Sequence, residues 1–293
     1  MSDMRERRIG LGGLQVAVAI PEKSAKRVAS SAIYRNLVRP AREMMRRGQS
    51  PVAAPAAAST LRNPWALPEL LNHPDGHLRH ARLAAAIKAG PGGQTLLSVG
   101  DPFCQMTSEL SSYEITYSDL SPALVSIPAG SHYVQADFTA DGIFAERSFD
   151  VVCSTDTLEH IPQDMRTGFL RRAIGIARRA AYIAFPAGPD ARAVEGFMRS
   201  SRSRTAFRDA LDEHAQHGLP ELGEIGSVLD GLGVNHRVRP LTTVAEWLSS
   251  FVFSPSDWEQ PELVLGYWDF LNQNTPDGAG AGPVYRYLIE VTL

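Results

Sequence analysis

The chain has 293 residues, of which 44% are apolar and 21% are charged. This composition is that of a globular protein large enough to bury its own core, and it excludes collagen-like, coiled-coil and fully disordered proteins. The formal net charge is −3, so the molecule as a whole has no electrostatic field that would attract nucleic acid.

The sequence predicts a soluble, cytoplasmic protein. The longest apolar stretch near the start, Ile9–Ile20, is interrupted by glycines and falls short of the ~20 residues that a membrane span needs. Asp3 and Glu6 in the first residues, with no A-x-A site after them, argue against a signal peptide. Two cysteines, Cys104 and Cys153, are too few for a disulfide framework and indicate a reducing compartment.

Residues 1–50 are basic, with eleven Lys and Arg against four Asp and Glu. Their pattern predicts an amphipathic helix over about 26–47, and PVAAPAAA at 51–58 predicts an extended linker. Three interpretations stay open for this segment. It is a solvated arm, a helix that docks on the domain or on a second copy in a homo-oligomer, or a contact for an acidic membrane surface or nucleic acid. We predict two units: the arm and linker at 1–58, and one α/β domain at 59–293.

Helices and short apolar strands alternate from about residue 61 onward. A helix is predicted over His77–Ala89, where a Gly-Pro-Gly-Gly run ends it. Strands are predicted at 95–99, 114–118, 132–136, 149–154 and 181–185, with an amphipathic helix around 165–177. These strands do not alternate cleanly between apolar and polar residues, and helices separate them. Both features indicate a parallel sheet covered by helices on both faces. The predicted class is therefore α/β, with a Rossmann-like doubly wound sheet.

The pattern changes after Gly188. Helices are predicted over 191–216 and 222–232, then a strand near 234–238 and a late antiparallel strand at 284–292. We expect about 191–275 to form a helical and aromatic lid insertion, although its aromatic residues also fit a satellite hydrophobic cluster. These residues are Trp247, Phe251, Phe253, Trp258, Tyr267, Trp268 and Phe270.

Acidic residues follow each of the first four predicted strands. Ligands of open α/β sheets bind beyond the carboxyl ends of the strands, where the strand order reverses. Asp119, 19 residues past Gly100, is placed to accept two hydrogen bonds from a ribose diol. Asp137 is placed to meet the exocyclic amine of an adenine, and Phe138 to lie against the ring. A single such aspartate is usually a turn or cap residue, but four at one sheet edge favour a ligand site.

Residues 95–186 resemble a class I S-adenosylmethionine-dependent methyltransferase of the type 11-like group. The most specific stretch is FDVVCSTDTLEHIP at 149–162, which is close to the family's fourth-strand motif, and YSDLS at 117–121 matches its second-strand motif, whose acid binds ribose. The resemblance implies a seven-stranded sheet with an antiparallel last strand, and S-adenosyl-L-methionine as methyl donor. The cofactor-binding residues that we expect are Gly100, Asp101, Asp119, Leu120, Asp137, Phe138, Thr155 and Asp156.

The glycine-rich first motif departs from the family's pattern of an acid followed by G-x-G-x-G. Ser98 replaces the acid, and Pro102 and Cys104 replace two glycines that let the backbone approach the methionine moiety. Asp101 is the candidate to bind the cofactor's amino group instead. Because the loop lacks these glycines, it favours an alternative function, that of a non-catalytic methyltransferase-like binding or assembly module. A nicotinamide dehydrogenase would need G-x-G-x-x-G, which is absent.

Methyl transfer from a sulfonium is an in-line displacement, in which the enzyme positions the acceptor and removes its proton. His160 is the candidate catalytic base, with Glu159 beside it as a substrate residue; otherwise the pair merely begins the next helix. His214 and His217 are candidate substrate residues in the lid. No H-x-x-x-H or C-x-x-C spacing on one element indicates a metal site, so no metal is expected. His160 and the lack of an Asn-Pro-Pro-Tyr-type motif favour O-methylation of a small-molecule or glycan acceptor.

Overall fold

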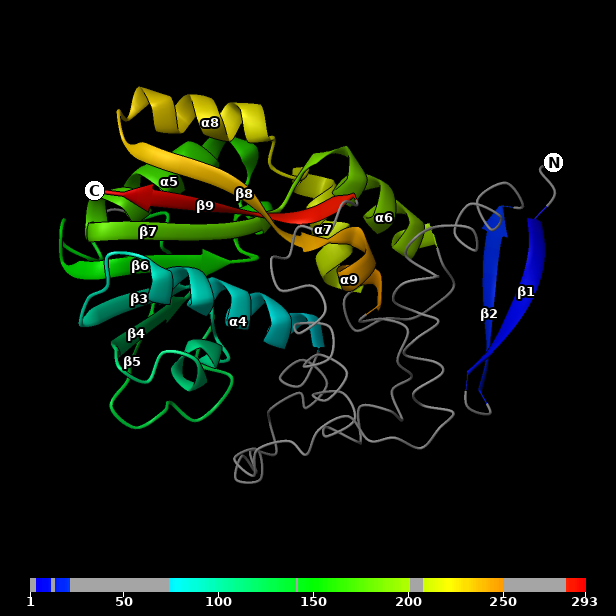
Figure 1. Cartoon of the computed structure of the whole chain (residues 1–293), viewed down its shortest axis with the longest axis horizontal. Helices are drawn as coiled ribbons and strands as arrows, with labels where there is room; N and C mark the ends of the chain where they lie inside the picture. The colour runs from blue at the N-terminus through cyan, green and yellow to red at the C-terminus, as the bar shows by residue number, and fades with distance from the viewer. Residues whose placement is uncertain (1–3, 12–13, 22–73, 141, 201–207, 250–282) are drawn as a thin grey trace.

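The computed structural model describes residues 4–11, 14–21, 74–140, 142–200, 208–249 and 283–293. Its main element is a seven-stranded sheet with the strand order β5-β4-β3-β6-β7-β9-β8 (Figure 1). The strands are β3 (Thr95–Val99), β4 (Glu114–Asp119), β5 (His132–Gln135), β6 (Phe149–Thr155), β7 (Ala177–Pro186), β8 (Asn235–Thr243) and β9 (Val284–Thr292).

The strand directions are those of a doubly wound sheet. Strands β3 to β7 pair in parallel, whereas β9 is antiparallel to both of its neighbours, β7 and β8. The predicted antiparallel last strand is therefore confirmed. The chain runs from β3 outward to β4 and β5, then returns to β6 on the other side of β3. The strand order thus reverses between β3 and β6, where open α/β sheets bind their ligands.

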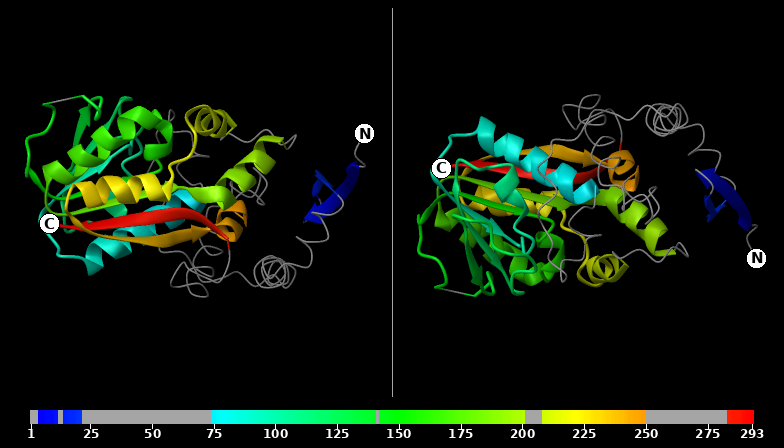
Figure 2. Two further views of the ribbon diagram at one scale, coloured as in Figure 1. Left: turned by 90° about the horizontal axis from the view of Figure 1, so that it is seen from above. Right: turned by 90° about the horizontal axis from the view of Figure 1, so that it is seen from below.

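Helices cover both faces of the sheet, as the two views in Figure 2 show. Helix α4 (Pro74–Ala89) lies on one face, and α5 (Gln163–Ile176) and α8 (Leu222–Gly231) lie on the other. Each face has its own apolar core: Leu83 and Ile87 of α4 pack in one, and Phe169 and Leu170 of α5 pack in the other. Burial of these aliphatic and aromatic faces stabilises the sheet that positions the site.

Three more helices gather at the edge to which the parallel strands point (Figure 1). They are α6 (Gly188–Ser200), α7 (Arg208–His217) and α9 (Val244–Ser249). A third, smaller apolar cluster joins them to β9, with the Trp247 ring stacked on Tyr285 at 4.2 Å between centroids. For Trp247, the satellite-cluster interpretation of the aromatic segment is thus the one that the packing supports. The other predicted lid aromatics lie outside the described residues.

Three expectations about elements need correction. The predicted strand at 181–185 begins earlier, at Ala177, and the single helix predicted over 191–216 is instead α6 and α7, with 201–207 outside the described residues. The basic segment holds an antiparallel pair, β1 (Met4–Leu11) and β2 (Leu14–Pro21), which the sequence pattern did not indicate. The helix predicted at 26–47 and the linker at 51–58 lie outside the described residues. No described helix is both long and apolar enough to span a membrane.

Candidate functional site

The point where the strand order reverses is closed by a contact between Gly100 and Thr157. Gly100 follows β3 with a φ of +77°, in the left-handed region, and its amide donates to the carbonyl of Ser118 in β4 at 2.8 Å. A Cβ at Gly100 would lie 2.0 Å from Oγ1 of Thr157, the second residue after β6. The loops after β3 and β6 therefore approach as closely as backbone allows, and only glycine fits at position 100.

The loop after β3 keeps a glycine-like backbone without the glycine. Cys104 adopts φ 52°, a left-handed conformation that is uncommon for residues with a Cβ. The carboxylate of Asp101 turns inward and accepts the amide of Gln105 at 2.9 Å, at the start of η3 (Gln105–Ser108). Burial raises the pKa of Asp101 to about 6. Its carboxyl group therefore helps to hold the loop.

Asp119, the last residue of β4, and Asp137, two residues beyond the end of β5, make the same kind of turn. Asp119 Oδ1 accepts the amide of Ser121 at 2.7 Å, and Asp137 Oδ1 accepts the amide of Thr139 at 2.8 Å. The Thr139 hydroxyl and amide lower the pKa of Asp137, so its carboxyl group is ionised at neutral pH. The two acids lie on neighbouring strands, as the sequence predicts, each held through one oxygen.

The residues that follow these acids differ from expectation. Leu120 is 71% exposed, and its carbonyl accepts a hydrogen bond from Gln135. Phe138 is 6% exposed and packs edge-on against Phe169 of α5, with 5.2 Å between ring centroids. Its ring belongs to the core of the domain. Contacts of either residue with a cofactor stay predictions.

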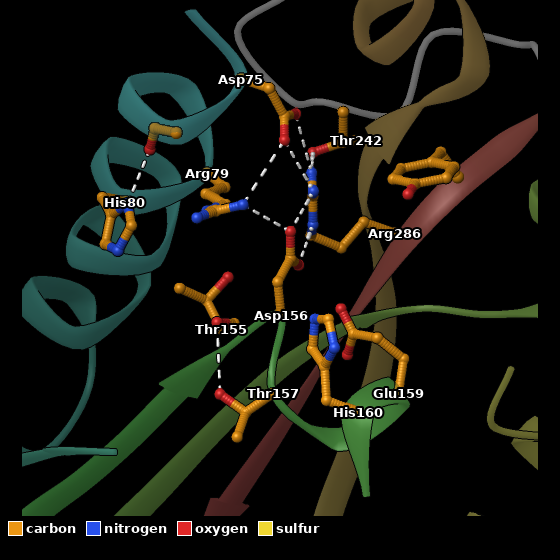
Figure 3. Close-up of polar contacts among 12 residues, drawn as sticks. Asp75, Arg79, His80, Thr155, Asp156, Thr157, Glu159, His160, Thr242 and Arg286 are labelled. Atoms are coloured by element: carbon orange, nitrogen blue, oxygen red, sulfur yellow. Dashed lines mark hydrogen bonds and ion pairs between the residues drawn. The ribbon is translucent and has the colours of Figure 1, made fainter. Parts of the chain in front are cut away.

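The carboxylate of Asp156, directly after β6, is bonded to two arginines (Figure 3). Arg286 of β9 donates from Nε and Nη2 to its two oxygens at 2.5 and 2.6 Å, and Arg79 of α4 donates to Oδ2 at 2.7 Å. Arg286 also binds both oxygens of Asp75. Burial alone would raise the pKa of Asp156, but Arg286 and Arg79 outweigh it and hold that pKa well below its usual range. The Asp156 carboxylate therefore ties together α4, β6 and β9, and a cofactor contact of Asp156 stays a prediction.

The neighbouring Thr155 is buried at the end of β6. Thr155 is 6% exposed, and its hydroxyl oxygen has no hydrogen-bond partner among the described residues. A cofactor contact of Thr155 stays a prediction.

Two histidines and a glutamate meet just beyond this ion cluster. Glu159 and His160 lie in η4 (Leu158–His160), and His214 comes from α7. The two imidazole Nε2 atoms are 3.2 Å apart, and Glu159 Oε1 is 3.9 Å from Nε2 of His214. Figure 3 shows Glu159 and His160 side by side, next to Asp156.

Carboxylates hold the outer nitrogens of both rings. His160 Nδ1 is 2.7 Å from Glu213 Oε2, and His214 Nδ1 is 3.1 Å from Glu195 Oε1. The Tyr285 hydroxyl donates to the same Glu195 oxygen at 2.8 Å. Both rings are thereby oriented with Nε2 toward the centre of the cluster.

Burial and charge shift the protonation of all three groups. Burial and the adjacent His214 lower the pKa of His160, so its ring is neutral at neutral pH. Burial opposes protonation of His214, but the hydrogen bond with Glu195 and the charge of Glu159 raise its pKa. Burial, with the negative charge of Asp156, raises the pKa of Glu159. Shifted pKa values on clustered groups occur often at functional sites.

His217 does not join this cluster. Only its backbone carbonyl is engaged, as an acceptor for Nη2 of the buried Arg166 at 3.3 Å. Arg166 also donates to the carbonyls of Leu158 and Ile161, so it joins η4 to the end of α7. A substrate contact of the His217 ring stays a prediction.

Sequence reasoning missed five residues that connect these parts: Asp75, Arg79, Arg166, Glu195 and Arg286. A positively charged residue in the apolar run of β9 was the one available signal, because an arginine inside a buried strand needs carboxylate partners. Its partners, 130 and 211 residues away in sequence, carry no pattern that would identify them.

Comparison with known proteins identifies the central part of the chain. Residues 97–185 match the family model described as "Methyltransferase domain". These residues are thus similar to a methyltransferase domain. The match spans β3 to β7 and includes Gly100, Asp119 and the Glu159–His160 pair.

The methyltransferase domain is similar to solved structures at low identity, whereas no curated protein sequence matches the chain. An S-adenosylmethionine-dependent methyltransferase from Archaeoglobus fulgidus is 15% identical, with a TM-score of 0.48, over 73% of this chain and 92% of that one. The plantazolicin methyltransferase in complex with S-adenosylhomocysteine is 12% identical, with a TM-score of 0.48, over 77% and 87%. Phosphoethanolamine N-methyltransferase 2 from Haemonchus contortus is 15% identical, with a TM-score of 0.44, over 75% of this chain and 57% of that one.

The described residues of the methyltransferase domain fit its cofactor, S-adenosylmethionine. Gly100 brings the loops after β3 and β6 together at the point where the strand order reverses, since Thr157 fills the space that a side chain would take. Asp119 and Asp137 each keep one carboxylate oxygen that accepts no hydrogen bond from a described residue. These oxygens suit the hydroxyl and amine donors of a nucleoside. Asp101, turned into the protein, is the least suited of the expected ligands.

Proposed function

We propose that this chain transfers a methyl group from S-adenosylmethionine to an oxygen of a small-molecule or glycan acceptor. The observation that supports the proposal is the position of the Glu159–His160–His214 cluster. It begins two residues after Thr157, which touches Gly100 at the point where the strand order reverses. An imidazole pair in that position is suited to act on the proton of a hydroxyl group.

Each part of the proposed site has a separate task. Asp119 accepts hydrogen bonds from the ribose hydroxyls, and Asp137 accepts one from the adenine amine. When bound, S-adenosylmethionine supplies a methyl group on a positively charged sulfur. The protein aligns the acceptor oxygen with that methyl group, because an in-line displacement gains most from correct orientation.

His160 promotes loss of the acceptor's proton. Its pKa is lowered, so the ring is neutral at neutral pH, and Glu213 fixes the orientation of the ring through Nδ1. His214 presents its Nε2 to the same space. The cluster thus favours a hydroxyl acceptor, whose proton must leave during or before transfer.

Calorimetry with three ligands tests the cofactor half of the proposal. S-adenosylmethionine and S-adenosylhomocysteine should bind at one site per chain, and NAD should not bind. Failure of both S-adenosyl compounds to bind would favour a methyltransferase-like module that has no catalytic activity. Binding of NAD would overturn the assignment altogether.

A His160→Ala variant tests the acceptor half. With ¹³C-methyl S-adenosylmethionine and a panel of hydroxyl-, amine- and glycan-bearing acceptors, NMR reports whether the methyl group arrives on oxygen or nitrogen. Turnover of the accepted compound should fall by roughly 10²–10⁴-fold in the variant, the usual contribution of a positioned proton acceptor. Cofactor affinity should stay unchanged. A stable variant with parental turnover would remove His160 from the mechanism.

A further inference from the structure

The Glu159–His160–His214 cluster has the form of a metal site built from two separate elements. One ligand atom from each residue lies within 4.8 Å of the other two. His160 and His214 are 54 residues apart in sequence, so no spacing motif on one element could reveal the site. The expectation of no metal rested on such a motif.

The hydrogen bonds around the two rings prepare their Nε2 atoms to bind a cation. The two Nε2 atoms lie within hydrogen-bond distance of each other, at 3.2 Å, and a proton can bridge them. With Nδ1–H of each ring directed at a carboxylate, Glu213 for His160 and Glu195 for His214, loss of that proton leaves a lone pair on each Nε2 facing the other. Metal-binding histidines usually have such a carboxylate on the outer nitrogen. Two facing lone pairs repel unless a positive centre lies between them.

Glu159 adds a carboxyl group to the two imidazoles, and this group binds an ion in its deprotonated form. Its side chain is 0% exposed, and neither carboxylate oxygen has a hydrogen-bond partner among the described residues. A buried carboxylate without hydrogen bonds is costly, and a coordinated cation is one of the few ways to compensate for it. This observation is independent of the histidine geometry and indicates the same place.

We propose that Glu159, His160 and His214 bind a divalent first-row transition metal ion such as Zn²⁺. At metal–nitrogen distances of about 2.0–2.1 Å, the Nε2 separation of 3.2 Å gives a ligand–metal–ligand angle of roughly 100°, close to tetrahedral. Rotation of the Glu159 side chain brings its oxygen, now 3.9 Å from His214 Nε2, into the same sphere. Imidazole nitrogens favour transition metals over Mg²⁺ and Ca²⁺, which prefer oxygen ligands.

Three protein ligands leave a coordination position open, as in catalytic zinc sites. The role of the ion rests on the proposed function: the open position takes the acceptor's hydroxyl oxygen and lowers the pKa of that hydroxyl. The O–H bond breaks and its proton passes to water, since Nε2 of His160 is then bound to the ion and the ring acts as a ligand rather than as the proton acceptor itself. An oxygen electron pair then forms the bond to the methyl carbon, while the electrons of the carbon–sulfur bond return to sulfur.

Metal titration of the chelator-stripped full-length protein tests the site without cofactor or acceptor. Zn²⁺ in calorimetry, and Co²⁺ by its visible absorption, should each bind at one ion per chain, and Mg²⁺ should bind far more weakly. Affinity for Zn²⁺ should fall at least 100-fold in His160→Ala and His214→Ala. His217→Ala is the matched control, since that ring lies on the same helix outside the cluster, and it should bind Zn²⁺ as the parent does.

Thermal melting separates loss of the site from loss of the fold. Zn²⁺ should raise the melting temperature of the parent and of His217→Ala but not of the two cluster variants, because only an ion bound to the native state stabilises it. If His214→Ala does not fold, Glu159→Gln and His214→Gln replace it in the same titrations. Parental Zn²⁺ affinity in these variants, or no stoichiometric Zn²⁺ binding by the parent, would overturn the proposal.

The role of the ion is tested separately from the proposed function. The stripped protein should still bind S-adenosylmethionine but methylate its acceptor at least 100-fold more slowly, and Zn²⁺ should restore the rate. A stripped protein of full activity would overturn the role. Failure to bind the cofactor would contradict the proposed function while leaving the metal titration valid.

Discussion

Two aspartates show how one side chain can shape a turn and still be available to a ligand. Asp119 and Asp137 each use a single oxygen to accept the amide of the residue two positions later, at 2.7 and 2.8 Å. Such local bonds make aspartate frequent at strand ends regardless of function. They also fix the direction of the carboxylate, so that its second oxygen is presented at the sheet edge without loss of rotamer freedom on binding.

Removal of the Asp119 carboxylate should weaken cofactor binding without unfolding the domain. We expect Asp119→Ala to lose about 1.5–3 kcal/mol of S-adenosylmethionine affinity in calorimetry, the range for hydrogen bonds to a charged group. Glu114→Ala is the control, because it removes an exposed carboxylate from the other end of the same strand. Equal affinity of a folded Asp119→Ala and the parent would disprove the ribose assignment.

Asp101 gives the fold a pH dependence opposite to that of most acids. Its pKa is raised from 3.8 to about 6, so the folded state takes up a proton between about pH 6 and pH 4 while the unfolded state does not. The cost of burying the charge is fully present above pH 6 and disappears as the pH falls to about 4.

Asp101→Asn should remove that pH dependence. The amide oxygen can still accept the Gln105 amide, so the variant should be more stable than the parent at pH 7.5, by up to about 3 kcal/mol. The difference should shrink to near zero at pH 4. Urea unfolding of both proteins across this range measures it, and a difference that does not change with pH would contradict the assignment.

At the scale of elements, the sequence predicts well β3, β4, β5 and β6, whose runs lead into a glycine or an aspartate, and also the late strand β9. Strands β3 and β9 have the predicted bounds, and β4, β5 and β6 differ by one residue at their ends. The missed start of β7 has a physical cause. Ala177 to Ala180 consists of good helix formers, yet Ala177 and Ala180 pair with Phe149 and Val151 of β6, and packing in the sheet overrides local propensity.

The residues of the site also differ in whether the local sequence can identify them. Gly100, Asp119 and His160 could be found from the sequence because Gly100 directly follows β3, Asp119 ends β4, and His160 lies in the motif that follows β6. The partners of Asp156 could not, because Arg79 lies 77 and Arg286 lies 130 residues away. Only the folded sheet, in which β7 alone separates β9 from β6, brings these charges together.

The buried Arg286 of β9 should be far more important for stability than the partly exposed Arg239 of β8. Arg286→Met leaves the buried carboxylates of Asp75 and Asp156 without their main partner, and loss of one member of a buried ion pair costs about 3–5 kcal/mol. Arg239→Met breaks only the partly exposed pair with Glu290 and should cost about 0–1 kcal/mol. Chemical denaturation of both variants decides this. A similar cost for the two would show that the buried cluster adds no special stability.

At the scale of the whole molecule, residues 1–55 should be dispensable for the methyltransferase domain. The seven-stranded sheet and both of its apolar cores come from residues after position 74. A chain lacking residues 1–55 should therefore melt near the parental temperature and bind S-adenosylmethionine with parental affinity. An insoluble product, or a large drop in melting temperature, would show that the basic segment is part of the fold.

The place of β9 in the sheet has a consequence for synthesis on the ribosome. Among the described residues, β9 is the only sheet neighbour of β8, and it separates β8 from β7. A nascent chain emerges from its amino end, so β8 leaves the exit tunnel before any strand with which it can pair. Until residues 284–292 follow, β7 keeps an open edge and Asp75 and Asp156 lack Arg286. A stalled ribosome would hold a chain with an exposed strand edge, the feature that chaperones protect from aggregation.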